Sequence, residues 1–291
     1  MTTTDDHTPT DEGNGTLRGD GVLSKLSYAF RSEPGPVRET NEDYAGAFAL
    51  TTPDDAWDRG PLFLVADGMG GHAAGEVASS VAVEAALQSW ARGTPGPPPQ
   101  ALRSAVRTAN IAVYDAALAP GRRGMGTTVV GATLAGREAI VGHVGDSRAY
   151  LVRGDECLQL TADHSRVGEM VRMRLLSPEE AAQHPARSQL TRSLGAQPGV
   201  QVDLTRQPIE TGDALVLCTD GLWDLVARAE MADAFATSEH PTSAPALTDA
   251  IVDLAIKRGA SDNVTAAVIV VTSTLPIPAA AGRRLFRRGR S

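Results

Sequence analysis

The chain has 291 residues, of which 42% are hydrophobic and 21% are charged, a composition typical of a globular protein with ample residues for a core. Its net charge of −8 argues against general binding of nucleic acid. No apolar run approaches the ~20 residues of a transmembrane helix, and the N-terminus is polar, so we expect a cytoplasmic protein without a membrane span.

The two ends of the chain carry opposite charge. Residues 1–20 hold five acidic side chains and one arginine, whereas residues 275–291 hold five arginines and no acid. Such biased segments are typical of disordered tails. We therefore predict one domain over 21–274, flanked by an acidic tail over 1–20 and an Arg-rich tail over 275–291. The basic tail is expected to be solvated, with contact to an acidic partner or a membrane surface as the alternative.

The first half of the domain is predicted to contain strands and then two helices. The apolar patterns place strands at Val22–Phe30, Tyr44–Leu50 and Leu62–Ala66. Helical spacing follows from Ala73 to Trp90 and from Ala101 to Leu118. The linker Gly93–Pro99 between them is so rich in proline that we expect neither helix nor strand to cross it.

The second half begins with closely spaced strands. These are predicted at Thr127–Leu134, Ala139–Val144, Ala149–Arg153 and Cys157–Leu160, and their short turns make them antiparallel neighbours. A polar segment, 161–199, follows as an excursion from the sheets. Strands at 200–206 and 214–218, helices at 231–236 and 244–257, and a strand at 264–271 complete the order. This order lacks βαβα alternation and favours an α+β fold of two packed antiparallel sheets with helix pairs outside.

Three aspartates occupy similar positions beside apolar strands. Asp67 and Asp220 each follow a strand and precede a glycine, and Asp262 directly precedes the last strand. An Asp–Gly pair is also a common turn, but a buried unpaired carboxylate is costly, and a divalent cation offsets that cost. Oxygen ligands without an accompanying His–Cys set favour Mg²⁺ or Mn²⁺.

A pair of such ions would make the protein an enzyme. Two ions about 3.5–4 Å apart lower the pKa of a shared water, which then suits attack on a phosphate ester. A guanidinium matches phosphate oxygens bidentately, and Arg38 is the candidate.

Eight short motifs then occur in a fixed order. They are R-x-x-N-E-D at Arg38–Asp43, V-A-D-G-M-G-G-H at Val65–His72, G-x-G-T-T at Gly124–Thr128, G-D-S-R at Gly145–Arg148, D-H-S at Asp163–Ser165, L-T-R-S-L-G at Leu190–Gly195, T-D-G-L at Thr219–Leu222 and S-D-N-V-T at Ser261–Thr265. In these motifs the sequence resembles the bacterial metal-dependent protein serine/threonine phosphatases of the PPM, or type 2C, family, from about Leu26 to Val271.

The resemblance implies a four-layer α-β-β-α sandwich with two Mn²⁺ or Mg²⁺ ions between the sheets. By this resemblance Asp67 would bridge both ions, Gly68 would offer its carbonyl to one of them, and Asp220 and Asp262 would hold the other. Glu42 and Asp43 would act through metal-bound waters. Arg38 would bind the substrate phosphate. Asp146 matches the ligand of a third, weaker ion, with Asp220 shared. The segment 167–187 would be a flap that shapes substrate access.

The implied activity is hydrolysis of phosphoserine and phosphothreonine on proteins, without a covalent intermediate, by a monomer that opposes a Ser/Thr kinase. Two alternatives are a narrow enzyme for one phosphorylated regulator, such as an anti-sigma-factor antagonist, and a non-catalytic binding module. Met69 stands where eukaryotic members carry a proposed general-acid histidine, which favours a metal-bound water as the acid. His72 is expected to brace the glycine turn, and His143 and His164 are expected to be structural.

Overall fold

The computed structural model describes residues 6–7, 10–11, 15–23, 25–49, 60–70, 74–93 and 96–273, and these form two antiparallel sheets. The first sheet has the order β1-β5-β6-β8-β9-β12, with β7 paired to β6. Its strands are β1 (Asp6–His7), β5 (Asp43–Phe48), β6 (Leu62–Met69), β7 (Gly126–Thr127), β8 (Val129–Ala135), β9 (Glu138–Val144) and β12 (Asp203–Pro208).

The second sheet has the order β11-β10-β13-β14-β4-β3-β2. Its strands are β2 (Thr10–Asp11), β3 (Leu17–Leu23), β4 (Leu26–Glu33), β10 (Arg148–Arg153), β11 (Glu156–Gln159), β13 (Ala214–Cys218) and β14 (Val264–Val271). The central strands β13 and β14 are buried along their whole length, and every residue of the two strands is apolar apart from Thr265.

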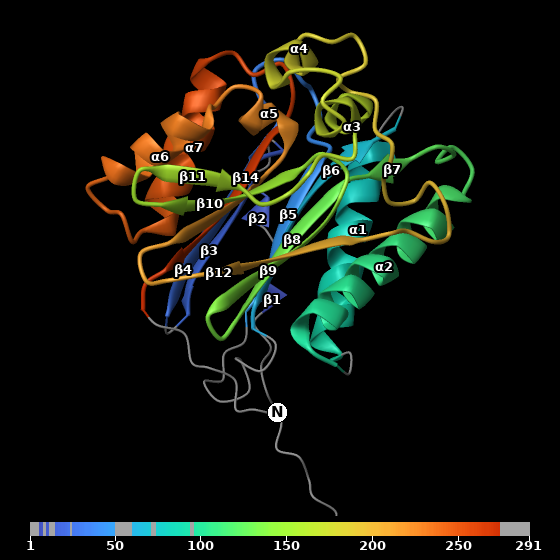
Figure 1. The fold of residues 1–291 in the computed structure, drawn as a ribbon. Coiled ribbons are helices and arrows are strands. Elements are labelled where there is room, and N and C mark those ends of the chain that lie inside the picture. The colour runs from blue at the N-terminus through green and yellow to red at the C-terminus, as the bar shows by residue number, and fades with distance from the viewer. Residues whose placement is uncertain are drawn as a thin grey trace, which may run out of the picture.

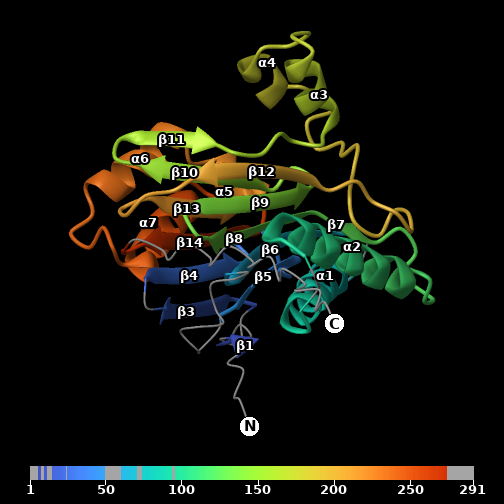
Figure 2. The ribbon, with the colours of Figure 1, turned by 60° about the horizontal axis from the view of Figure 1, so that its bottom comes forward.

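Helices cover the outer face of each sheet, as Figures 1 and 2 show. The helices α1 (Ala74–Ala91) and α2 (Pro98–Ala117) pack on the first sheet, and α6 (Arg228–Ala236) and α7 (Ala244–Lys257) pack on the second. Three apolar cores therefore separate four layers. Tyr28 and Phe63 lie in the core between the sheets, and Trp90 and Ile251 lie in the two outer cores. The predicted α-β-β-α sandwich is confirmed.

Two local predictions are wrong. The segment Val22–Phe30 is not one strand, because β3 and β4 form a hairpin whose register pairs Leu23 with Leu26. Five successive residues of β4 are buried, so the alternation from which the strand was predicted does not describe it. The second helix also begins earlier than the predicted Ala101. Helix α2 starts at Pro98, at the end of the proline-rich linker, because proline lacks only an N–H that the first turn leaves unbonded.

The predicted domain limits, 21 and 274, stay a prediction, although β3 crosses the first of them. Residues 275–291 lie outside the described residues. Among the described helices, none has the length and apolar character required to span a bilayer.

Candidate metal centre

Carboxylates from both sheets meet at one end of the sandwich. Asp67 lies near the end of β6, its partner across the first sheet is Asp43 at the start of β5, and Asp220 follows β13 in the second sheet. Burial raises the pKa of Asp67 well above its usual range, and the charges of four other aspartates raise it further. Those four are Asp43, Asp220, Asp146 and Asp262. The structure thus brings all five predicted aspartates into one cluster.

Burial also raises the pKa of three other members of the cluster, Asp43, Asp146 and Asp220. Burial and then the charge of Asp220 raise the pKa of Asp146 to about 7. Burial raises the pKa of Asp43 to about 7 despite two hydrogen bonds that oppose the shift, and burial raises that of Asp220 to about 6. A raised pKa means that the ionised form of the carboxyl is less stable here than in water, because burial removes its hydration.

The backbone of Asp67 is fixed by the threonines of the G-x-G-T-T motif. Thr128 Oγ1 accepts from the Asp67 N–H at 3.0 Å, and the Thr128 N–H donates to the Asp67 carbonyl at 2.9 Å. Thr127 Oγ1 donates to the same carbonyl at 2.8 Å. The residue Asp67 as a whole is only partly buried.

Gly68 stands where three backbone segments converge. Its N–H donates to the Glu42 carbonyl at 3.0 Å, and a Cβ at this position would lie 2.0 Å from the Gly75 carbonyl oxygen. Glycine is therefore required here by close packing against the start of α1.

Glu42 is held beside Gly68 by residues distant in sequence. Asn263 Oδ1 accepts from the Glu42 N–H at 2.8 Å, and Asn263 Nδ2 donates to the carbonyls of Pro34 and Thr40. Burial raises the pKa of Glu42, while Arg38 and a backbone hydrogen bond from Gly75 lower it. Asn263 thereby fixes the loop that carries both Arg38 and Glu42.

Asp43 has a different environment from the other aspartates. It is 3% exposed, and its Oδ2 accepts hydrogen bonds from Thr219 Oγ1 at 2.8 Å and Thr265 Oγ1 at 2.6 Å. This oxygen is already bonded, which suits an indirect role through water rather than direct ligation.

Arg38 forms an ion pair with another predicted site residue. Its Nη2 donates to Asp262 Oδ2 at 2.8 Å, and both side chains are nearly half exposed. The predicted phosphate-binding group and a predicted metal ligand are therefore neighbours, and neither is locked in the interior.

Asp146 lies in the loop between β9 and β10. The adjacent Ser147 Oγ lies 2.6 Å from Thr128 Oγ1, and Arg148 makes a bidentate pair with Asp163. Ser147 and Arg148 therefore hold the turn that carries Asp146. The motifs G-x-G-T-T, G-D-S-R and D-H-S are thus parts of one scaffold around Asp67 and Asp146.

The predicted flap contains two short helices, α3 (Arg166–Arg172) and α4 (Pro178–Ala182), which stand out from the sheets in both ribbon views (Figures 1 and 2). Its ends are joined, because Arg166 N–H donates to the Gln189 carbonyl and Thr191 N–H donates to the His164 carbonyl, each at 2.8 Å. Arg187, at the end of the predicted flap, forms an ion pair with Asp224, with 3.7 Å between Nη1 and Oδ2. Asp224 directly follows α5 (Asp220–Trp223), so this ion pair links the flap to the helix that begins with Asp220.

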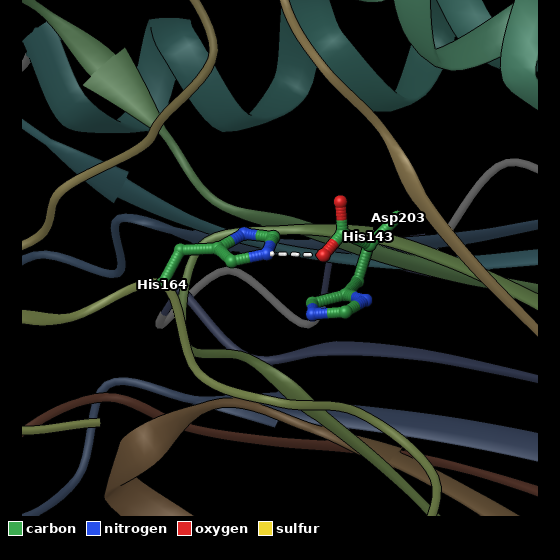
Figure 3. A group of neighbouring side chains, drawn as sticks. All are labelled: His143, His164 and Asp203. Carbon is green, nitrogen blue, oxygen red and sulfur yellow. Dashed lines mark hydrogen bonds and ion pairs between the residues drawn. The ribbon is translucent and has the colours of Figure 1, made fainter. Parts of the chain in front are cut away.

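A second group with ligand-like spacing lies at the base of this segment. His143, His164 and Asp203 offer ligand atoms within 4.8 Å of one another, and a hydrogen bond joins His164 and Asp203 (Figure 3). Arg192, however, donates to Asp203 Oδ1 at 2.8 Å and neutralises its charge. The Gly145 N–H donates to His164 Nδ1, and His164 Nε2 lies 3.1 Å from Asp203 Oδ2 and 3.0 Å from Arg192 Nη1, so both ring nitrogens already have protein partners. Because His164 and Arg192, one on each side of the flap, both bond Asp203, these contacts are better explained as links that hold the flap ends than as a cation site.

The aspartate cluster, in contrast, fits divalent metal ions. Burial raises the pKa values of Asp43, Asp67, Asp146 and Asp220, and the arginines beside the cluster, Arg38 and Arg187, have side chains 48% and 56% exposed. Hard oxygen donors in this number suit Mg²⁺ or Mn²⁺, whose charge would stabilise the ionised cluster.

Sequence reasoning missed the residues that hold the cluster in place. Asn263, Thr219 and Thr265 stand within the recognised motifs, which was the available signal, but their partners lie far away in sequence. His72 and its predicted bracing role lie outside the described residues.

Comparison with known proteins decides the family. Residues 39–264 match the family model described as protein phosphatase 2C. The chain belongs to the protein phosphatase 2C family. It is 37% identical to the serine/threonine phosphatase stp of Listeria innocua over 246 residues, which cover 82% of this chain and 94% of the relative.

Solved structures agree with this family membership. The serine/threonine phosphatase PstP/Ppp of Mycobacterium tuberculosis is 37% identical, with a TM-score of 0.73 over 85% of this chain and 99% of that one. A structure of the catalytic domain of PstP in complex with two manganese ions is 34% identical, with a TM-score of 0.72 over 86% of this chain and 99% of that one. The chain is therefore a metal-dependent protein phosphatase.

Proposed function

We propose that this protein removes phosphate from phosphoserine and phosphothreonine side chains of proteins, using water activated by Mn²⁺ or Mg²⁺ and no covalent intermediate. The observation that carries the proposal is the convergence of five aspartates at one end of the sandwich, of which Asp262 is ion-paired with Arg38 and Asp43, Asp67, Asp146 and Asp220 have pKa values raised mainly by burial. The named activity of the relatives supports it.

In this proposal Asp67, the Gly68 carbonyl, Asp220 and Asp262 hold two ions, with Glu42 and Asp43 acting through bound water and Asp146 holding a third, weaker ion. The ions supply a water of lowered pKa and positive charge to the phosphate. Thr127 and Thr128 orient Asp67, and Asn263 orients Glu42 and Asp262. The closed position of Asp43 supports its indirect role.

Arg38 is proposed to bind the phosphate. Its side chain is half exposed, its Nη2 donates to Asp262 Oδ2 and its Nε donates to the Ser261 carbonyl, so the N–H groups of Nη1 remain to donate to phosphate oxygens. The flap end at Arg187 adds positive charge beside Asp220.

The test measures phosphate release from a phosphothreonine peptide with Mn²⁺, and then with EDTA. We expect turnover that EDTA abolishes and Mn²⁺ restores, with a matched phosphotyrosine peptide cleaved far more slowly. Turnover that is unchanged in EDTA, or a preference for phosphotyrosine, would contradict the proposal.

We also propose that the protein works in the cytoplasm as a monomer, on substrates phosphorylated by a Ser/Thr kinase. Cys157 and Cys218 are free, which suits a reducing compartment. Of the exposed large apolar side chains among the described residues, Val22, Ile111 and Leu158 lie on separate elements, and Met173 and Leu175 lie close together after α3 in the flap. Sedimentation at micromolar concentration would reveal a dimer if the proposal of a monomer is wrong.

A further inference from the structure

Trp223 connects two parts of the metal centre. It is the last residue of α5, the short helix that begins with Asp220. Its indole Nε1 donates to the backbone carbonyl of Asp146 at 3.1 Å. One helical turn therefore carries a predicted metal ligand at its start and, at its end, a tether to the backbone of a second predicted ligand.

The indole ring is itself held from one face. The Arg148 guanidinium carbon lies 3.5 Å from the centre of the Trp223 ring, a cation–π contact. Arg148 is fixed by Asp163, with N–O distances of 3.0 and 2.7 Å, and by the Tyr150 hydroxyl at 3.2 Å. Because these partners restrain the guanidinium, they also restrain the ring and the direction of its N–H.

The Asp146 loop is restrained from more than one side. It follows Gly145, whose φ of +109° is open to glycine but strained for other residues. On its other sides the loop is held by the Gly145 N–H, which donates to His164 Nδ1, and by Ser147 Oγ, which lies 2.6 Å from Thr128 Oγ1. The bond from Trp223 adds a direct connection from the Asp146 backbone to α5.

We propose that Trp223 is a positioning residue that fixes Asp146 relative to Asp220, so that both can bind the same cation. This inference rests on the proposed function, because the cation shared by Asp146 and Asp220 is the third and most weakly bound of the proposed Mn²⁺ ions. Loss of one hydrogen bond behind a metal ligand typically lowers metal affinity about 10- to 100-fold.

Trp223→Phe tests the proposal, because phenylalanine keeps an aromatic face for Arg148 but removes the N–H. Trp90→Phe is the matched control: the Trp90 indole also donates to a backbone carbonyl, that of Gly60 at 3.2 Å, but in the outer core beside α1. Calorimetric titration of the full chain with Mn²⁺ gives the affinity of each binding step, and thermal unfolding in EDTA reports folding.

We expect Trp223→Phe to weaken the weakest Mn²⁺ step at least tenfold while the tighter steps match wild type and unfolding matches Trp90→Phe. Asp146→Asn should remove that step, and Trp223→Phe should have no further effect on Mn²⁺ binding in the Asp146→Asn background.

Equal Mn²⁺ isotherms for wild type and Trp223→Phe would overturn the proposal, as would weakening of every step together with a greater loss of thermal stability than Trp90→Phe shows. A wild-type chain that binds Mn²⁺ but has no Asp146-dependent step would overturn this inference and leave the phosphatase assignment intact. A wild-type chain without Mn²⁺ binding or turnover would overturn both.

Discussion

Neutralising Asp146 should stabilise the metal-free protein while impairing its metal binding. Asp146 as a residue is 8% exposed, and the pKa of its carboxyl is raised from 3.8 to about 7 by burial and by the charge of Asp220. That rise corresponds to about 4 kcal/mol of destabilisation when the group is ionised at pH 8. Movement of the loop relieves part of this repulsion, so we expect Asp146→Asn to raise the unfolding free energy by about 1–3 kcal/mol.

The sign of the pH dependence follows from the same shift. The folded chain binds a proton at Asp146 between about pH 4 and pH 7, where the unfolded carboxyl is ionised, so the stability of metal-free protein falls as pH rises through this window. Asp43, with a pKa of about 7, and Asp220, with one of about 6, act in the same direction. The advantage of Asp146→Asn should therefore be largest at pH 8 and small at pH 5.

Thermal unfolding in EDTA measures this effect, and the expected increase at pH 8 is about 2–6 °C. Asp213→Asn is the control, because Asp213 is a buried carboxylate paired with Arg153 at 2.6 Å, and its neutralisation should lower the melting temperature at both pH values. A melting temperature of Asp146→Asn at or below wild type at pH 8 would refute the reasoning, as would an equal gain at pH 5.

Three further substitutions test individual contacts. Arg38→Ala should raise KM for a phosphopeptide about 10- to 100-fold with a smaller change in kcat, because charge-assisted bonds to phosphate are lost; an unchanged KM would remove Arg38 from phosphate binding. Thr128→Val keeps the side-chain shape but leaves the Asp67 N–H without its acceptor, so unfolding should become easier by about 1–3 kcal/mol and turnover should fall; wild-type stability and turnover would show that this bond is dispensable. Asn263→Ala removes the contacts to Pro34, Thr40 and Glu42 and should weaken both Mn²⁺ binding and phosphopeptide binding, whereas a loss confined to one of them would contradict its placement of the whole loop.

The layers of the fold were predictable because their signals are local. The spacing of Leu247, Ile251 and Leu254 predicted a helix that the structure gives as α7, and the apolar run Val264–Val271 predicted β14 with its bounds. The β3–β4 hairpin was not predictable in the same way, because β4 is buried on both faces and has no alternation to show its limits.

The sequence predicted which residues form the site, but not the contacts that hold them in place. The position of Asp67 and Asp220 after apolar strands indicated a cation site, and their cluster is what the structure shows. The bonds from Thr219 and Thr265 to Asp43 join residues 176 and 222 positions apart, so they depend on strand register across the two sheets. The Arg38–Asp262 ion pair and the Trp223–Asp146 hydrogen bond also join segments distant in sequence, so they depend on how the whole chain folds.

The most direct test of the central claim compares Asp220→Asn with wild type in Mn²⁺-dependent turnover of a phosphothreonine peptide, with Mn²⁺ binding measured on the same samples. If the aspartate cluster holds the catalytic metal, Asp220→Asn will fold, bind fewer Mn²⁺ ions and lose turnover at least a hundredfold across the Mn²⁺ titration, an effect of about 3 kcal/mol. Wild-type turnover and wild-type Mn²⁺ binding in Asp220→Asn would show that the metal centre lies elsewhere.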